Sequence, residues 1–210
     1  MKNQHVYTTP VNFVSFMIAN PGLWKTYLTK CAFSKSAFEQ DLPWLSVEAI
    51  NKIYDRMEPG MKVLEFGGGG STLFFAKNNL SVTTIESSME YKTNIESKLL
   101  SNNLTNVEVL YRPFEVTNEA ELRNSKYLNS IPDSGFDIIL VDGPEIADYK
   151  ARPICFEWAE KNIKAGGIIV VDDSWRYPQL LTENNAIYVD ECAGIGPGRK
   201  GMTKTDIFYY

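Results

Sequence analysis

A run of four glycines between a short apolar segment and a candidate helix constrains this chain more than any other feature. Residues 63–66 (Val-Leu-Glu-Phe) predict a buried strand, and residues 71–76 predict the start of a helix. A strand, a glycine turn and a helix in succession bring backbone N–H groups close to a nucleotide-like ligand. The dinucleotide-binding fingerprint is incomplete, because the sixth position counted from Gly67 is Thr72, where that fingerprint requires Gly or Ala.

Apolar runs alternate with helical segments over most of the chain, which predicts a parallel sheet covered on both faces. We expect strands at residues 62–66, 82–86, 107–111, 136–141 and 167–171, and helices at residues 46–57, 89–100 and 153–163. Two final strands, at 186–189 and 206–209, should pair antiparallel because their connection is too short for a crossover helix. The predicted fold is α/β: a Rossmann-like, doubly wound, mostly parallel seven-stranded sheet with a C-terminal antiparallel hairpin, preceded by N-terminal helices.

Aromatic residues are concentrated in residues 1–45, where we expect a helical extension. It could act as a cap or lid over a site, or be buried against the sheet. Residues 46–210 should form the main domain, whose first helix Ser46 can cap, and Ser87 or Ser88 can cap the helix at residues 89–100. The glycine-rich segment 194–201 is expected to be a flexible hairpin loop, although its Arg199 and Lys200 could instead meet an anionic substrate.

The composition of the chain argues against several classes of function. The net charge of −5 over 210 residues argues against a nucleic-acid partner, which requires a basic face. Three widely spaced cysteines without a CxxC pattern argue against a disulfide framework or a zinc site, and a single histidine, His5, argues against a Ser-His-Asp mechanism. The apolar stretch 11–19 is too short to span a membrane, and no signal peptide is recognised, so we expect a cytoplasmic protein without a membrane partner.

The predicted strands end at polar or glycine residues. In open α/β sheets the ligand lies beyond the carboxyl ends of the strands, which selects Gly67, Glu86, Asp142 and the Asp172–Ser174 segment. Glu86 follows Glu65 by 21 positions, where an acid can accept both ribose hydroxyls of an adenosine; the alternative is a solvated acid.

The acid-x-Gly-x-Gly pattern of Glu65, Gly67 and Gly69 resembles that of class I S-adenosylmethionine (SAM)-dependent methyltransferases, and the resemblance covers residues 46–210. It implies S-adenosyl-L-methionine as the cofactor. Ser71 and Thr72 could then donate to the methionine carboxylate, or simply cap the helix. Phe114 could stack on the adenine, or be a core aromatic.

Asp142 and Asp173, at the ends of the fourth and fifth strands, resemble the two acids of small catechol-type O-methyltransferases. That resemblance implies a catalytic role and a divalent cation such as Mg²⁺, although Ser174 stands where the family has an Asn. Alternatively, Asp142 caps a turn or orients SAM and Asp173 bonds backbone amides. The Asp-Gly-Pro sequence with Arg152 resembles sugar O-methyltransferases, which implies that Arg152 could clamp a substrate carboxylate or be a surface charge.

These resemblances imply an enzyme that methylates an oxygen of a small molecule or sugar, which could work as a homodimer. Two alternatives stay open. One is an NAD-dependent Rossmann oxidoreductase, and the other is a SAM- or nucleotide-binding module without catalysis.

Overall fold

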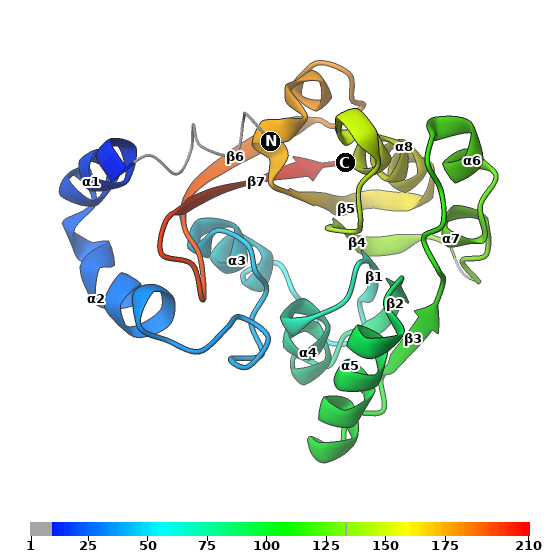
Figure 1. Ribbon diagram of the computed structural model, residues 1–210, viewed down its shortest axis with the longest axis horizontal. Coiled ribbons are helices and arrows are strands. Elements are labelled where there is room, and N and C mark those ends of the chain that lie inside the picture. Colours follow the sequence, from blue (N-terminus) through cyan, green and yellow to red (C-terminus); the bar gives the residue numbers. More distant parts are fainter. Residues whose placement is uncertain (1–9, 133) are drawn as a thin grey trace.

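The computed structural model describes residues 10–132 and 134–210, which form a seven-stranded sheet in the order β3-β2-β1-β4-β5-β7-β6 (Figure 1). The strands are β1 (Lys62–Phe66), β2 (Ser81–Glu86), β3 (Val107–Tyr111), β4 (Phe136–Val141), β5 (Ile163–Asp172), β6 (Tyr188–Ile195) and β7 (Met202–Tyr209). β1 to β5 pair in parallel, and β7 is antiparallel to both β5 and β6. The predicted fold class is confirmed.

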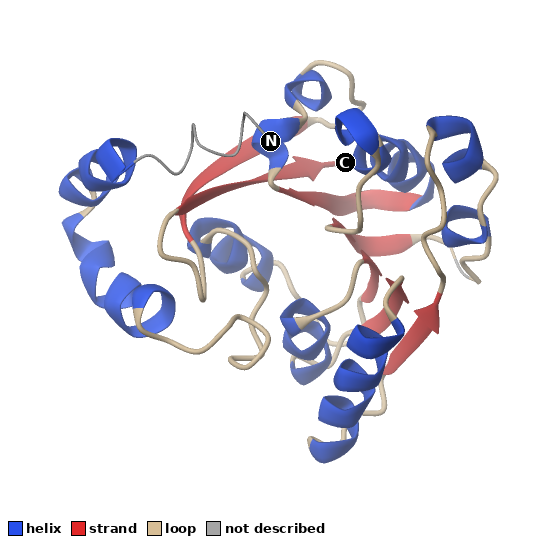
Figure 2. Cartoon of the chain, in the orientation of Figure 1, coloured by secondary structure: helices blue, strands red, loops and turns tan. Residues whose placement is uncertain are grey.

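Helices cover both faces of the sheet (Figure 2). On one face lie α3 (Val47–Tyr54), α4 (Gly70–Lys77) and α5 (Met89–Ser101), and on the other lie α6 (Glu119–Arg123), α7 (Lys126–Asn129) and α8 (Ala151–Asn162). Successive side chains along a strand point to opposite faces of the sheet, so each strand contributes to the core on both faces. Val63 packs toward α3 and α4, whereas Leu64 and Phe66 pack toward α6 to α8.

Helix starts follow the predicted capping residues. The Ser46 hydroxyl accepts a hydrogen bond from Ala49 N at 3.2 Å at the start of α3, and the Ser88 hydroxyl accepts one from Tyr91 N at 3.3 Å at the start of α5. Pro153 lies in the first turn of α8, where its missing N–H is not needed.

The C-terminal hairpin differs from its prediction. β6 and β7 are longer than expected, and the connection between them is not a free loop. Gly198 N donates to Lys30 O at 3.0 Å, and the Tyr27 hydroxyl donates to Lys200 O at 2.9 Å. The prediction of a flexible loop is wrong because the N-terminal segment holds this connection in place.

The N-terminal segment is helical, as predicted, with α1 (Pro10–Ala19), a 3₁₀ turn (Pro21–Leu23), α2 (Trp24–Thr26) and a π-helical turn (Tyr27–Ala32). Met17 and Cys31 are buried against Ile195 at the end of β6, so the segment packs on the edge of the sheet. Its outer side is exposed, and Phe33 is 84% exposed. His5 lies outside the described residues. None of the described helices has the length and apolar character needed to cross a membrane.

The sheet register places the site. Phe66 lies opposite Ile85 and Val141, and Val141 lies opposite Val171. The four central strands therefore end level with one another, and the residues that follow them emerge at one edge.

Gly70 provides a test of how the N-terminal segment joins this edge. A Cβ at Gly70 would lie 2.1 Å from Leu42 O and 2.8 Å from Ala37 O, whereas a Cβ at Gly69 would have no neighbour within 4 Å. We expect Gly70→Ala to lower the free energy of unfolding by about 1–3 kcal/mol, because backbone atoms must move apart. Chemical denaturation measures this, with Gly69→Ala as the matched control. Equal stabilities of the two variants would contradict the close packing.

Candidate functional site

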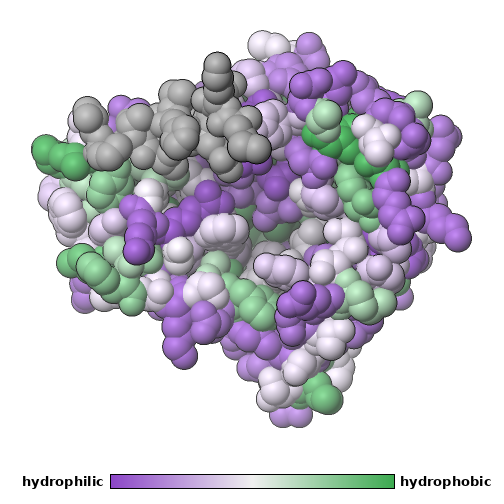
Figure 3. Space-filling model, viewed as in Figure 1, coloured by the Kyte–Doolittle hydropathy of each residue, from purple (hydrophilic) through white to green (hydrophobic). Residues whose placement is uncertain are grey.

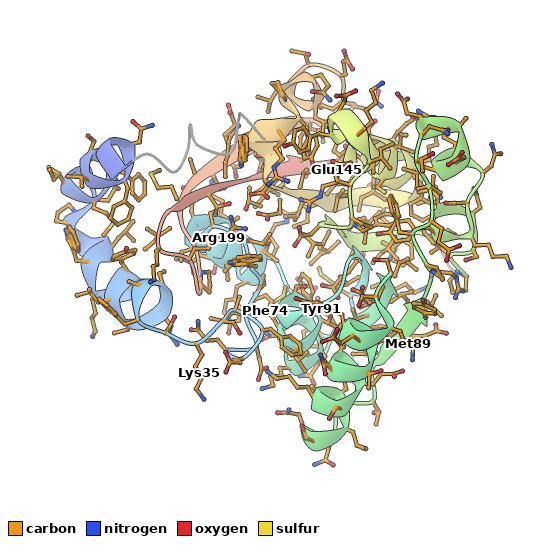
Figure 4. The ribbon with its side chains drawn as sticks, viewed as in Figure 1. Lys35, Phe74, Met89, Tyr91, Glu145 and Arg199 are labelled. Carbon is orange, nitrogen blue, oxygen red and sulfur yellow. The ribbon has the colours of Figure 1, made fainter. Side chains whose placement is uncertain are left out.

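A pocket of about 400 Å³ lies at the carboxyl ends of the central strands. Its floor is the glycine turn, Gly67 to Ser71, and one wall is the first turns of α5, with Glu90, Tyr91 and Asn94. The remaining wall consists of Asp142, Gly198 and residues of the N-terminal segment, namely Ser36, Ala37, Phe38 and Trp44. Figure 3 shows the molecule hollowed near the centre of this face, and Figure 4 labels Tyr91 of α5 and Arg199 of the β6–β7 connection.

Gly67 is required by the fold itself. Its φ is +88°, and a Cβ there would lie 2.6 Å from Asp142 O. A side chain at this position would therefore push β1 away from the end of β4.

Glu65 and Thr72 lie beneath the glycine turn. Glu65 is fully buried, and its carboxylate accepts hydrogen bonds from the Thr72 hydroxyl at 2.6 Å and the Thr84 hydroxyl at 2.8 Å. The Thr72 oxygen also accepts a bond from Gly69 N at 3.1 Å. Burial raises the pKa of Glu65 to about 7, against the opposing effect of hydrogen bonds from Ser71, Thr72 and Thr84. These contacts fix the turn from below, and neither residue lines the pocket.

Glu86 meets the glycine turn directly. Its carboxylate accepts hydrogen bonds from Gly68 N at 2.9 Å and from Ser88 N at 2.6 Å. This places the acid at the end of β2 against the turn, as the sequence spacing predicted. Gly69 and Ser71 line the pocket, whereas Glu86 is buried behind the turn and is not among the lining residues.

The aromatic side chains of the pocket differ from the predicted one. Phe114 packs edge-on against Tyr127, with ring centroids 5.0 Å apart, and joins the core under α6 to α8. It is not among the residues that line the pocket, where Phe38, Trp44 and Tyr91 lie instead. None of these three was predicted to line a site, although the abundance of aromatic residues before residue 46 was a signal for Phe38 and Trp44.

Arg152 is buried, and its guanidinium contacts other residues of the protein instead of facing the pocket. Its Nε donates to Gly143 O at 3.0 Å, its Nη1 donates to Asp172 O at 2.9 Å, and its Nη2 lies 3.0 Å from Asp142 Oδ1. The interpretation of Arg152 as a substrate clamp is wrong, because each of these three nitrogens already has a partner. Burial raises the pKa of Asp142, and the Arg152 charge opposes that rise.

Asp173 and Asp172 are held by two further arginines. Asp173 lies 2.9 Å from Arg176 Nη2 and 3.5 Å from Arg199 Nη1, while Asp172 lies 3.3 Å from Arg199 Nη2 and accepts a bond from the Thr205 hydroxyl at 3.0 Å. Burial, with the nearby Asp142 and Asp173 charges, raises the pKa of Asp172 to about 8. Arg199 also stacks on the Trp44 ring, 4.3 Å from its centroid, which ties the N-terminal segment to the strand ends.

These contacts do not fit the predicted divalent cation. Among the described residues, no group of three or more His, Cys, Asp or Glu side chains is placed to hold a metal ion. Asp142 and Asp173 each pair with arginine, whose positive charge would repel a cation bound between them. Since three arginines already neutralise the three acids, a metal would have to displace existing ion pairs.

Comparison with known proteins identifies the fold. No family model matches the sequence, and no curated protein matches it either. Solved structures do match. A candidate O-methyltransferase from Klebsiella pneumoniae is 15% identical over 94% of this chain and 98% of its own, with a TM-score of 0.60. The O-methyltransferase TomG from Streptomyces achromogenes, solved with SAM, is 18% identical over 100% of this chain and 99% of its own, with a TM-score of 0.55.

A third similar structure is that of an enzyme that methylates ribosomal RNA. It is the T. Thermophilus 16S rRNA N2 G1207 methyltransferase RsmC, solved with SAM and guanosine. It is 15% identical over 80% of this chain and 43% of its own, with a TM-score of 0.60. At these identities the likeness establishes the fold, which is that of class I SAM-dependent methyltransferases, as the sequence resemblance implied.

The buried Glu65 generates a pH prediction. Its pKa in the folded protein, about 7, exceeds the ordinary value of 4.5, so the folded state holds the proton more tightly than the unfolded chain. Stability should therefore fall as the pH rises from about 4.5 to about 7, by about 3 kcal/mol for this group alone. We expect Glu65→Gln to lack that loss, so that its advantage over the wild type grows between pH 5 and pH 8 in denaturant titrations. A stability difference that does not change with pH would contradict the assignment, and Glu108→Gln, at an exposed position of β3, serves as the control substitution.

Proposed function

We propose that the chain is a SAM-dependent methyltransferase that acts on an oxygen of a small molecule or sugar. The observation that carries the proposal is the convergence of the glycine turn, Glu86 and Asp142: the glycine turn and Asp142 line one pocket, and Gly68 N of that turn lies 2.9 Å from the Glu86 carboxylate. A ligand in open α/β sheets binds at this position, where the strand order reverses between β1 and β4. The pocket volume of about 400 Å³ suits a nucleoside-sized molecule.

In this proposal the cofactor rests on the glycine turn. Glu86 binds the ribose hydroxyls, while Gly67, Gly69 and Ser71 lie along the methionine portion. Glu65 and Thr72 contribute by holding the turn in shape from below. Ser36, Ala37, Phe38 and Trp44 of the N-terminal segment line the pocket, which supports a cap role for this segment and a cofactor-binding role mainly for residues 46–210.

Asp142 is our candidate for the residue that orients and deprotonates the acceptor hydroxyl. SAM, when bound, supplies a methyl group on a positively charged sulfur, and the protein must align the acceptor oxygen and receive its proton. Burial raises the pKa of the Asp142 carboxyl, which makes it a better proton acceptor than an exposed aspartate. Asp173, engaged by Arg176 and Arg199, suits a positioning role better than that of a base.

Two alternatives are weaker. An NAD-dependent oxidoreductase is disfavoured by Thr72 in the glycine motif and by the antiparallel position of β7. A module that binds SAM without catalysis would not need a half-buried acid such as Asp142 on the pocket wall. The fold itself leaves the acceptor open, and a cytoplasmic location and a homodimer stay predictions.

Removal of the Glu86 carboxylate should weaken cofactor binding. We expect Glu86→Ala to cost about 1.5–3 kcal/mol of SAM affinity, the range for hydrogen bonds to a charged group, and Glu86→Gln to cost less. Calorimetry with SAM, S-adenosylhomocysteine and NAD measures this, with the exposed Glu108→Ala on β3 as the matched control. Unchanged SAM affinity in both Glu86 variants, or tighter binding of NAD than of SAM, would contradict the proposal.

Removal of the Asp142 charge should affect turnover more than binding. We expect Asp142→Asn to lower kcat by about 10²-fold or more, the contribution of one general base, with little change in SAM affinity. Because the acids are already paired with arginines, activity should also persist in EDTA. Full turnover of the variant would exclude Asp142 from the reaction. Loss of activity in EDTA with recovery in Mg²⁺ would show that the enzyme does need a divalent cation.

A further inference from the structure

The outermost part of the N-terminal segment, residues 10–35, is apolar on two sides. We call this part the arm. Its inner side packs against the sheet edge through Met17, Cys31 and the partly buried rings of Phe13 and Phe16. Its outer side exposes five large apolar residues: Val14, Ile18, Trp24, Leu28 and Phe33. Figure 1 shows α1 and α2 at one edge of the molecule, outside the sheet and its covering helices.

Such a distribution is unusual for a helix that faces water on one side. Surface helices normally carry polar residues on the outer side, whereas helices that are apolar all round are covered by another surface. Ile18 is 72% exposed and Phe33 is 84% exposed, so burial of these two side chains contributes little to the stability of the fold. Figure 3 shows hydrophobic patches along the edge where the arm lies.

The charges of the arm identify the kind of surface that would cover it. The arm, residues 10–35, contains three lysines, Lys25, Lys30 and Lys35, and no acidic residue, in a chain of net charge −5. All three lysines are exposed; Lys25 and Lys30 lie between exposed apolar residues, and Lys35 lies two residues after Phe33. The arm is therefore the cationic part of an acidic protein, and its complement carries negative charge.

We propose that the arm binds the surface of an anionic lipid bilayer, whereas the sequence alone predicted no membrane partner. Trp, Phe and Leu together with Lys are the composition of segments that lie in the membrane interface. Lysine is depleted at protein–protein interfaces, and two arms facing each other in a dimer would bring like charges together. The apolar side chains would enter the interface while the lysines contact acidic headgroups.

This placement has a consequence for the pocket. The arm continues directly into Ser36, Ala37 and Phe38, which line the pocket wall. A protein bound through its arm would hold the pocket near the bilayer. The inference itself does not depend on the proposed function.

Sedimentation with lipid vesicles tests the proposal on the full chain. We expect the protein to sediment with vesicles that contain about 30% phosphatidylglycerol in phosphatidylcholine, to bind phosphatidylcholine alone weakly, and to be released by about 0.5 M NaCl. The double variant Ile18→Glu with Phe33→Glu should bind at least about tenfold more weakly, because it loses apolar contacts and gains negative charge. Both positions are so exposed that the fold should tolerate the change, which circular dichroism checks.

The matched control is Leu100→Glu with Ile187→Glu, since each of these residues is 80% exposed but lies outside the arm. The control should sediment like the wild type. Absence of wild-type binding to the anionic vesicles, or equal losses in the two double variants, would overturn the proposal. So would a wild-type dimer in light scattering that only the arm variant dissociates, because the arm would then be covered by a second copy.

Discussion

The close approach of Gly67 to the backbone of Asp142 is the constraint on which the site depends. With no side chain at Gly67, β1 and β4 can end side by side, and the turn that follows can bend into α4. The same turn brings Gly68 N to the Glu86 carboxylate, so one backbone path joins the ends of three strands. Any side chain here would separate those ends before it could obstruct a ligand.

Charge balance is the second condition. Asp142, Asp172 and Asp173 would repel one another if they stood alone at adjacent strand ends. Arg152, Arg176 and Arg199 each contact one or two of them, and Arg199 reaches from the C-terminal hairpin to Trp44 of the N-terminal segment. The arginines thus offset the repulsion between the three aspartates. Arg199 also links the N-terminal segment and the C-terminal hairpin to these strand ends.

The sequence was sufficient for features set by local patterns. Apolar periodicity predicted the five parallel strands, capping residues predicted the starts of α3 and α5, and spacing placed Glu86 at the turn. It was insufficient where contacts join distant segments. Neither the burial of Glu65 between Thr72 and Thr84 nor the position of Trp44 beside Arg199 has a local signal, because each depends on how strands and loops pack. Arg152 was misjudged for the same reason, since its partners Gly143 and Asp172 meet only in the folded sheet.

The position of β7 has a consequence for how the protein is made. β7 is the last strand in the chain, yet it lies between β5 and β6 in the sheet. During synthesis, β5 and β6 cannot reach their final arrangement until residues 202–209 have left the ribosome. Gly198 and Arg199, which complete the pocket wall and its ion pairs, precede that strand and are fixed by it. The nascent chain therefore lacks a finished pocket until β7 has paired with β5 and β6.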